Sequence, residues 1–136
     1  MITWEHIAAQ EALFARAFAM GDPTIARPLY DPGVVYVSPT VRLFGWQREI
    51  EGVERTLEFI ALTIRRCTAI RYVAIETALV PDRDAAFVCI EFDWTVDERR
   101  LRSRYVVRYE YRDGRIARQE LYYDPSAPPV DVGPGA

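Results

Sequence analysis

The sequence predicts an α+β fold in which two helical segments cover one face of a curved antiparallel sheet. Apolar residues recur at helical spacing up to about residue 64, whereas short strands separated by turn residues follow from about residue 69. The chain has 136 residues, 50% of them hydrophobic, which is the size and composition of one domain. We expect residues 1–124 to form this domain, and the proline- and glycine-rich residues 125–136 to form a loose tail without chemistry.

A first helix is expected over residues 4–20. Thr3 can cap its N-terminus, and Gly21 can take the left-handed conformation that often ends a helix. Its apolar stripe consists of Ile7, Phe14, Ala17 and Phe18. A short second helix should begin after Asp22 and be limited by Pro28.

A strand over residues 34–37 and a long helix complete the N-terminal part. Residues 31–33 form a turn before the strand, and Pro39 closes it because proline cannot donate to a sheet ladder. The long helix carries apolar residues at three- and four-residue steps: Ile50, Val53, Leu57, Ile60, Ala61 and Ile64. Four strands follow at roughly 69–80, 85–96, 101–112 and 115–124, with turns at Pro81-Asp82 and Asp113-Gly114.

The central hairpin separates apolar and charged residues onto opposite faces. If residues 97–100 form the connection, Val96 lies opposite Leu101. One face then collects Val88, Ile90, Phe92 and Trp94 opposite Tyr109, Val107, Tyr105 and Ser103. The other face places Asp93 opposite Arg104 and Thr95 opposite Arg102. The apolar face should be the one that the helices cover.

Glu91 and Asp93 point the same way along one strand. Two nearby carboxylates can divide the roles of acid and base when burial separates their pKa values. The register instead places both among arginines on the outer face, so we favour ion pairing over catalysis. A β-bulge would reverse that interpretation.

The final hairpin has two possible registers. A two-residue turn at Asp113-Gly114 would point Ile116, Arg118, Glu120 and Tyr122 inward. A turn at Arg112-Asp113 followed by a bulge at Gly114 would instead point Ala117, Gln119, Leu121 and Tyr123 inward. We favour the second register because it buries no formal charge.

Composition argues against several classes of function. The net charge is −3, and all 17 basic residues are arginine, with a cluster over residues 99–104 that we assign to ion pairs rather than to nucleic acid. The only histidine is His6, and Cys67 and Cys89 have no metal-ligand spacing, so we expect no metal, no cofactor and reduced thiols. No apolar run is long enough to span a bilayer and no secretory signal is evident, so we expect a cytoplasmic protein without membrane association.

The order of elements carries a family resemblance. Residues 29–39 (LYDPGVVYVSP), residues 112–116 (RDGRI) and the ending Tyr123-Asp124-Pro125 resemble SnoaL-like members of the nuclear transport factor two-like superfamily. The resemblance implies a cone-shaped fold with a pocket between the concave sheet and the helices, and often a homodimer formed through the sheet. The family includes polyketide cyclases, ketosteroid isomerase, epoxide hydrolases and non-catalytic binding proteins. The resemblance therefore leaves the function open among these classes, because the fold does not fix the function.

The acidic residues of the catalytic relatives are replaced in this chain. Ser38 stands before Pro39, where the isomerase-like pattern has a general base, and Phe14 stands where the isomerase has a tyrosine. Leu121 occupies the last-strand position at which several relatives carry an acid. The tripeptide most similar to the Arg-x-Asp motif of the epoxide hydrolases is Glu91-Phe92-Asp93, which lacks the arginine.

The predicted function is a pocket for a small hydrophobic molecule that carries a few oxygens. The expected ligand-binding residues are Phe14, Phe18, Tyr36, Ser38, Leu57, Phe92, Trp94, Tyr105, Val107, Leu121 and Tyr123. An isomerase-, cyclase- or hydrolase-like enzyme ranks slightly ahead of a non-catalytic binder or homodimeric scaffold, and a protein-partner role ranks third. The candidates for catalysis are Tyr36, Glu91, Asp93 and Glu120. A carboxyl inside the pocket would favour an enzyme, and its absence would favour a binder.

Overall fold

We describe the protein from a computed structural model, which covers residues 1–135 and excludes the side chains of Arg42 and Leu43. The helices are α1 (Trp4–Met20), the 3₁₀-helix η1 (Pro23–Leu29), α2 (Pro39–Leu43) and α3 (Val53–Arg66). The strands are β1 (Tyr30–Val37), β2 (Glu49–Glu51), β3 (Thr68–Leu79), β4 (Ala85–Val96), β5 (Arg99–Arg112), β6 (Arg115–Tyr122) and β7 (Val130–Pro134).

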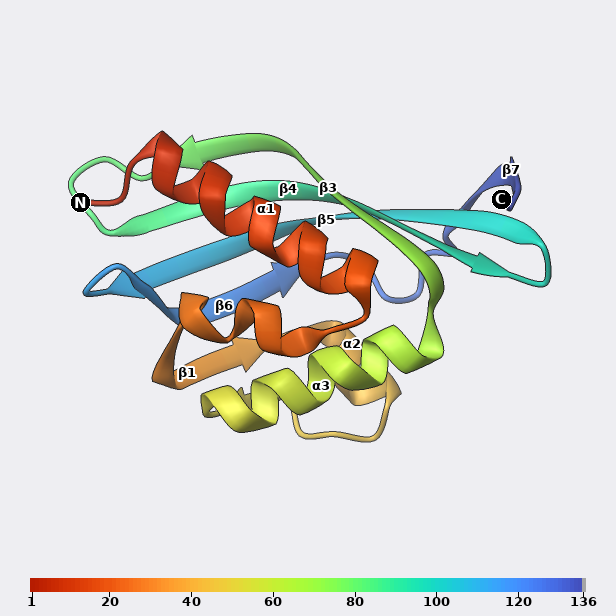
Figure 1. Cartoon of the computed structure of the whole chain (residues 1–136), viewed down its shortest axis with the longest axis horizontal. Helices are drawn as coiled ribbons and strands as arrows, with labels where there is room; N and C mark the ends of the chain where they lie inside the picture. The colour runs from red at the N-terminus through yellow and green to blue at the C-terminus, as the bar shows by residue number, and fades with distance from the viewer. Residues whose placement is uncertain (136) are drawn as a thin grey trace.

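A curved, unclosed sheet forms the body of the molecule, and the helices α1, η1 and α3 cover one of its faces (Figure 1). The strand order is β2-β1-β6-β5-β4-β3, with β7 added to β5. The α+β fold and the covering helices are therefore as predicted. The sheet is mixed rather than wholly antiparallel, because β1 pairs with β6 in parallel. Parallel neighbours need a long connection, and here α2, α3 and the β3–β5 meander supply it.

The first helix has the expected ends and buries the expected stripe. The Thr3 hydroxyl accepts a hydrogen bond from the His6 amide at 3.1 Å, and Gly21 has a φ of +64°. Ile7, Phe14 and Ala17 are buried against the sheet. The buried side of α1 also carries two polar residues, Gln10 and Glu11.

The long helix begins later than predicted. Ile50 belongs to β2, where it lies opposite Tyr36 and is 3% exposed. Gly52 has a φ of +91°, which lies outside the helical region, so α3 starts at Val53. Ile50 is buried as expected, but it is not part of the helix. Its three-residue spacing from Val53 matched the helical pattern by coincidence.

The hairpin β4–β5 has the predicted faces in a different register. Its turn is Asp97-Glu98, so Val96 lies opposite Arg99, two positions from the predicted pairing. Side chains alternate along a strand, so a shift of two leaves every residue on its expected face. Asp93 consequently lies opposite Arg102 and not opposite Arg104, and Arg100, not Arg102, lies opposite Thr95.

The hairpin β5–β6 combines features of both predicted registers. Its turn is the two-residue Asp113-Gly114, with φ of +51° and +78°, and not the Arg112-Asp113 turn favoured from the sequence. A bulge at Ala117 then shifts the register, so that Gln119 lies opposite Tyr109 and Leu121 opposite Val107. Ile116 is fully buried before the bulge, and no charged residue of β6 has to turn inward.

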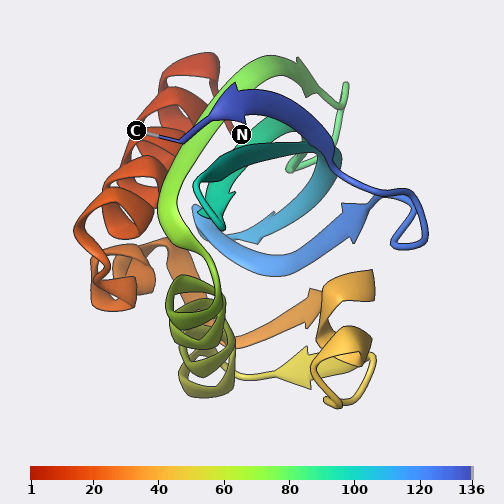
Figure 2. The same cartoon turned by 90° about the vertical axis from the view of Figure 1, so that its right-hand side faces the viewer.

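The C-terminal residues are ordered where a loose tail was expected. Val130–Pro134 form β7, which pairs with residues 99–102 of β5. In Figure 2 the curled strands are seen end-on, and this dark-blue segment runs along the rim nearest the viewer. The segment therefore lies at one open end of the curved sheet.

Candidate functional site

A cavity of about 910 Å³ lies between the helices and the curved sheet. Its aromatic lining comes from five elements and from the segments that follow α2 and β6: Phe18, Tyr36, Phe44, Phe59, Phe92, Trp94, Tyr105 and Tyr123. Aliphatic side chains and prolines also line it, and its polar points are hydroxyl groups from Thr40, Thr63 and Ser103 and the side chains of Arg66, Arg102 and Arg104. Such a lining suits a mainly apolar molecule held by a few hydrogen bonds.

The residues predicted for ligand binding divide into a lining and a layer behind it. The cavity is lined by Phe18, Tyr36, Phe92, Trp94, Tyr105, Leu121 and Tyr123. Phe14, Ser38, Leu57 and Val107 are buried at 1–5% exposure and lie behind this lining. These four side chains belong to the packed interior and do not line the cavity.

Two parts of the lining were not predicted from the sequence. Phe44, Phe59, Ile60 and Thr63 form the wall on the side of α2 and α3. Phe59 is only 2% exposed and packs with Tyr36 and Ile50 in a second core cluster. The other missed part is the C-terminal segment, which contributes Pro125, Ala127, Pro128, Pro129, Val130 and Val132.

Tyr36 and Tyr123 form a polar corner of the cavity with Ser38 behind them. Burial raises the pKa of both phenols above the ordinary value of 10.0. Ser38 is 1% exposed, and its side chain lowers the pKa of both phenols but does not outweigh burial. Both groups therefore stay protonated near neutral pH, and they can donate hydrogen bonds to a ligand oxygen but cannot serve as bases.

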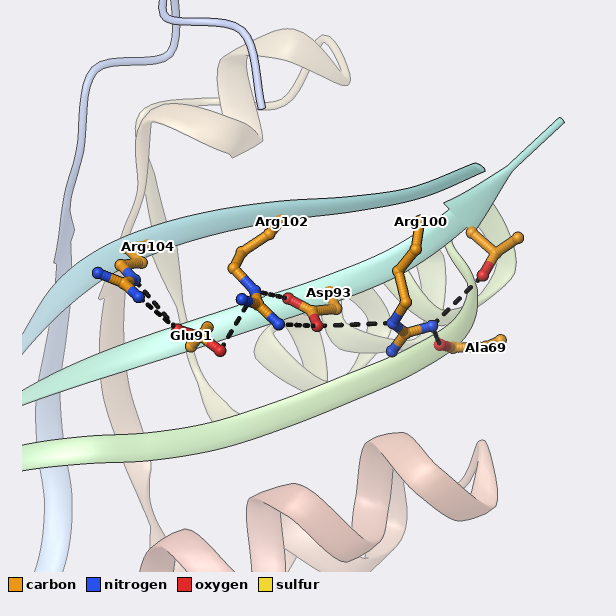
Figure 3. Close-up of polar contacts among 7 residues, drawn as sticks. Ala69, Glu91, Asp93, Arg100, Arg102 and Arg104 are labelled. Carbon is orange, nitrogen blue, oxygen red and sulfur yellow. Dashed lines mark hydrogen bonds and ion pairs between the residues drawn. The ribbon is translucent and has the colours of Figure 1, made fainter. Parts of the chain in front are cut away.

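Glu91 and Asp93 are held in a ladder of arginines on the outer face (Figure 3). Arg102 binds Asp93 with two bonds of 2.8 and 3.0 Å, and Arg100 approaches the same carboxylate at 3.5 Å. Arg104 lies 2.9 Å from Glu91. The hydrogen bond from Arg102 lowers the pKa of Asp93 despite burial. The two carboxylates form the predicted ion pairs and do not line the cavity, whereas their partners Arg102 and Arg104 do.

Glu120 also lies outside the cavity. Its carboxylate accepts hydrogen bonds from Tyr122 and Arg118, which lower its pKa in that order of importance. Arg118 in turn reaches Glu49 of β2 at 3.3 Å. None of the three acidic candidates for catalysis therefore lines the cavity.

One carboxyl does lie inside the fold, on α1. Glu11 is 6% exposed and accepts hydrogen bonds from the hydroxyls of Tyr72 and Tyr109 and from the Gln10 amide. Desolvation raises its pKa, and these three hydrogen bonds only partly oppose that effect. Gln10 also accepts a hydrogen bond from Tyr111 at 2.7 Å. Glu11 does not line the cavity, so its partners are protein groups and not a ligand.

A second hollow, of about 720 Å³, lies on the surface next to β2. Its lining contains Gln47, Glu49, Glu51 and Arg55, together with Trp46 and Ile50. The Arg55 guanidinium stacks on the Trp46 ring at 3.8 Å. These polar groups are solvated side chains, and the aromatic cavity is the better candidate site.

The described residues contain no group of three or more His, Cys, Asp or Glu side chains that could hold a metal ion. Among residues 1–135, no helix is both long and apolar enough to cross a membrane. Cys67 lines the cavity as a free thiol, and burial raises its pKa.

Comparison with known families agrees with this geometry. The family model described as a SnoaL-like domain matches residues 11–119. The chain belongs to the SnoaL-like family. The matched range begins within α1 and ends within β6, so it holds the helices and the sheet that enclose the cavity but not the C-terminal segment. No curated protein matches the sequence.

Solved structures share the SnoaL-like fold at low sequence identity. A protein from Bacillus subtilis assigned as an isomerase is 23% identical with a TM-score of 0.76, over 92% of this chain and 91% of that one. A protein of ketosteroid isomerase-like fold from Catenulispora acidiphila, in complex with trimethylamine, is 14% identical with a TM-score of 0.72, over 92% and 89%. TerC, co-crystallised with polyporic acid, is 22% identical with a TM-score of 0.72, over 88% and 89%.

Proposed function

We propose that this SnoaL-like protein binds a small, largely apolar molecule that carries one or a few oxygen atoms. The observation that carries the proposal is the aromatic cavity of about 910 Å³, which is far larger than the voids of a packed core. Tyr36 and Tyr123 would donate hydrogen bonds to a carbonyl or phenolic oxygen of the ligand. The complex of TerC with polyporic acid is consistent with this ligand class on the same fold.

We further propose that the protein acts as a binder rather than as an acid–base enzyme. Among residues 1–135, the only carboxylate in the cavity lining is Asp124, at the exposed mouth. Its side chain accepts hydrogen bonds from the Ser126 hydroxyl and amide, which lower its pKa. Buried tyrosines can stabilise an enolate but cannot remove the proton that creates one. The location of the carboxyl groups thus reverses the slight preference for an enzyme.

A pair of substitutions on neighbouring positions of β6 tests the ligand proposal. Leu121 lines the cavity, whereas Tyr122 lies on the outer face and is 51% exposed. Titration with the neutral fluorescent probe N-phenyl-1-naphthylamine should give saturable binding at one site per chain. Leu121→Arg should weaken that binding by about tenfold or more, because it replaces an apolar side chain of the lining with a charged one. Tyr122→Arg should leave the affinity within about twofold, since it changes only the outer face.

Two results of this titration would count against the proposal. Absence of saturable binding by the unmodified protein would remove the ligand site. Equal losses from Leu121→Arg and Tyr122→Arg, with both variants folded by circular dichroism, would place the probe elsewhere.

We also propose that two copies associate through the outer face of the sheet. Phe87 of β4 and Tyr122 of β6 are 38% and 51% exposed on that face, beside Val106. Burying such side chains against a second copy would be favourable. Light scattering after size-exclusion chromatography should give the mass of a dimer, and Phe87→Glu should give a monomer. Met20→Glu, at a 62% exposed position on α1, is the control that should stay dimeric.

A further inference from the structure

The C-terminal segment, residues 123–135, closes a gap in the sheet next to the cavity. Strand β6 pairs with β5 only from Val106 onward, and β7 pairs with β5 only up to Arg102. Within residues 1–135, no strand pairs with Ser103–Tyr105 on that side of β5. Ser103 and Tyr105 both line the cavity, so the cavity opens where the sheet is interrupted.

The segment crosses this opening with apolar side chains. Its contribution to the cavity lining includes Pro125, Pro128, Pro129, Val130 and Val132. Val130 and Val132 remain 62% and 41% exposed although they belong to an ordered strand. Exposed valines at the rim of a cavity offer surface that an apolar ligand can cover.

Specific contacts hold the segment in place. Arg99 binds Asp131 with two hydrogen bonds of 3.0 and 2.9 Å, in the paired geometry that fixes orientation. The Gly135 amide donates a hydrogen bond of 2.7 Å to the Glu98 carbonyl. A Cβ at Gly135 would lie 2.6 Å from Cγ2 of Thr95, so the backbone approaches β4 closely there.

We propose that residues 123–135 form a wall of the ligand site that sets its affinity for apolar molecules, and that the Arg99–Asp131 pair latches this wall to β5. The inference rests on the proposed binding function and assigns part of it to a segment outside the SnoaL-like match. The proline-rich stretch is stiff, so latching one end would hold the whole wall over the opening.

Matched valine substitutions test the wall in the full-length chain. Val132 and Val96 are both 41% exposed on strands, but only Val132 lines the cavity. Val132→Asp should weaken N-phenyl-1-naphthylamine binding by about fivefold or more, because it makes the wall polar. It should weaken the anionic probe 1-anilinonaphthalene-8-sulfonate further, through repulsion between like charges. Val96→Asp should change neither affinity by more than about twofold.

A charge swap tests the latch. Arg99→Glu should weaken binding of the neutral probe by about threefold, and Arg99→Glu with Asp131→Arg should restore it, because the swap reverses the pair without removing it. The same reversal at Arg27 and Glu54, an exposed pair between η1 and α3, should leave binding unchanged.

The outcomes separate this inference from the binding proposal. If the unmodified protein binds the probes but Val132→Asp and Val96→Asp change the affinity equally, residues 123–135 are not a wall of the site. The proposal of a ligand site in the cavity would then still hold. If Arg99→Glu tightens binding, the segment obstructs the cavity and is not a wall of the site, which also overturns the inference. If the unmodified protein binds neither probe, the binding proposal itself fails.

Discussion

Replacing Glu11 with alanine should destabilise the protein strongly, although the residue touches no ligand. The Tyr72 and Tyr109 hydroxyls and the Gln10 amide donate to this one carboxyl, and it is 6% exposed. Each buried donor left without an acceptor costs about 1–3 kcal/mol. We therefore expect Glu11→Ala to lower the free energy of unfolding by at least about 3 kcal/mol.

The same carboxyl should make stability depend on pH in a defined direction. Burial raises the pKa of Glu11 above its ordinary value of 4.5, so the folded protein holds the proton to a higher pH than the unfolded chain does. The stabilising contribution is complete below pH 4.5 and is lost as the pH rises through the folded pKa. Glu11→Gln, which keeps the shape without the charge, should not show this loss.

Urea unfolding at several pH values measures both effects. The difference in unfolding free energy between the unmodified protein and Glu11→Gln should fall above pH 4.5, by at most about 1.4 kcal/mol per pH unit. Glu58→Ala, at an exposed glutamate of α3, should change stability by less than about 0.5 kcal/mol. A difference that rises with pH, or a mild Glu11→Ala variant, would refute the account of this network.

Three smaller predictions concern the ladder, a turn and the cavity. Asp93→Asn should lower the free energy of unfolding by about 2 kcal/mol near neutral pH. Because the pKa of Asp93 is lowered in the folded protein, this loss should disappear as the pH falls below 3.8. A loss that does not change with pH would argue against the ion pairs. Gly114→Ala should lower the free energy of unfolding by about 1 kcal/mol because the φ of Gly114 is +78°. Gly33→Ala should be nearly neutral, because Gly33 has no positive φ. Equal shifts of the thermal unfolding midpoint for the two variants would contradict this. Tyr123→Phe should weaken binding of 2-naphthol by about threefold to tenfold and leave binding of N-phenyl-1-naphthylamine unchanged. An equal effect on both probes would argue against a hydrogen bond between the Tyr123 hydroxyl and the ligand oxygen.

The faces of the sheet could be predicted from the sequence more reliably than its pairings. The predicted β4–β5 connection, residues 97–100, was two residues too long, yet Phe92 and Asp93 lie on their expected faces because alternation is unchanged by an even shift. The bulge at Ala117 could not be predicted, since it depends on the burial of Ile116 before it and Gln119 after it. The turn residues indicated where the β5–β6 hairpin reverses direction but not that a bulge in β6 changes which residues pair.

The interior polar network left a signal in the sequence that was not used. Gln10 and Glu11 lie between Ile7 and Phe14 on the apolar stripe of α1, at helical spacing from both. Polar residues on a buried stripe require partners, which here are tyrosine hydroxyls from β3 and β5. Those partners are remote in sequence, so only the folded chain identifies them.

The cavity wall formed by the C-terminal segment was the largest omission. Prolines and glycines predicted a loose tail, because their composition favours irregular backbone. Docking of β7 depends on the edge of β5 that β6 leaves unpaired and on the Arg99–Asp131 pair. These are tertiary features that local composition does not contain.

A crystal structure grown with N-phenyl-1-naphthylamine tests the central claim most directly. The account predicts density for one probe molecule inside the aromatic cavity, in contact with Leu121, Tyr105 and Val132. Density only on the outer face of the sheet, or an empty cavity at saturating probe, would contradict it.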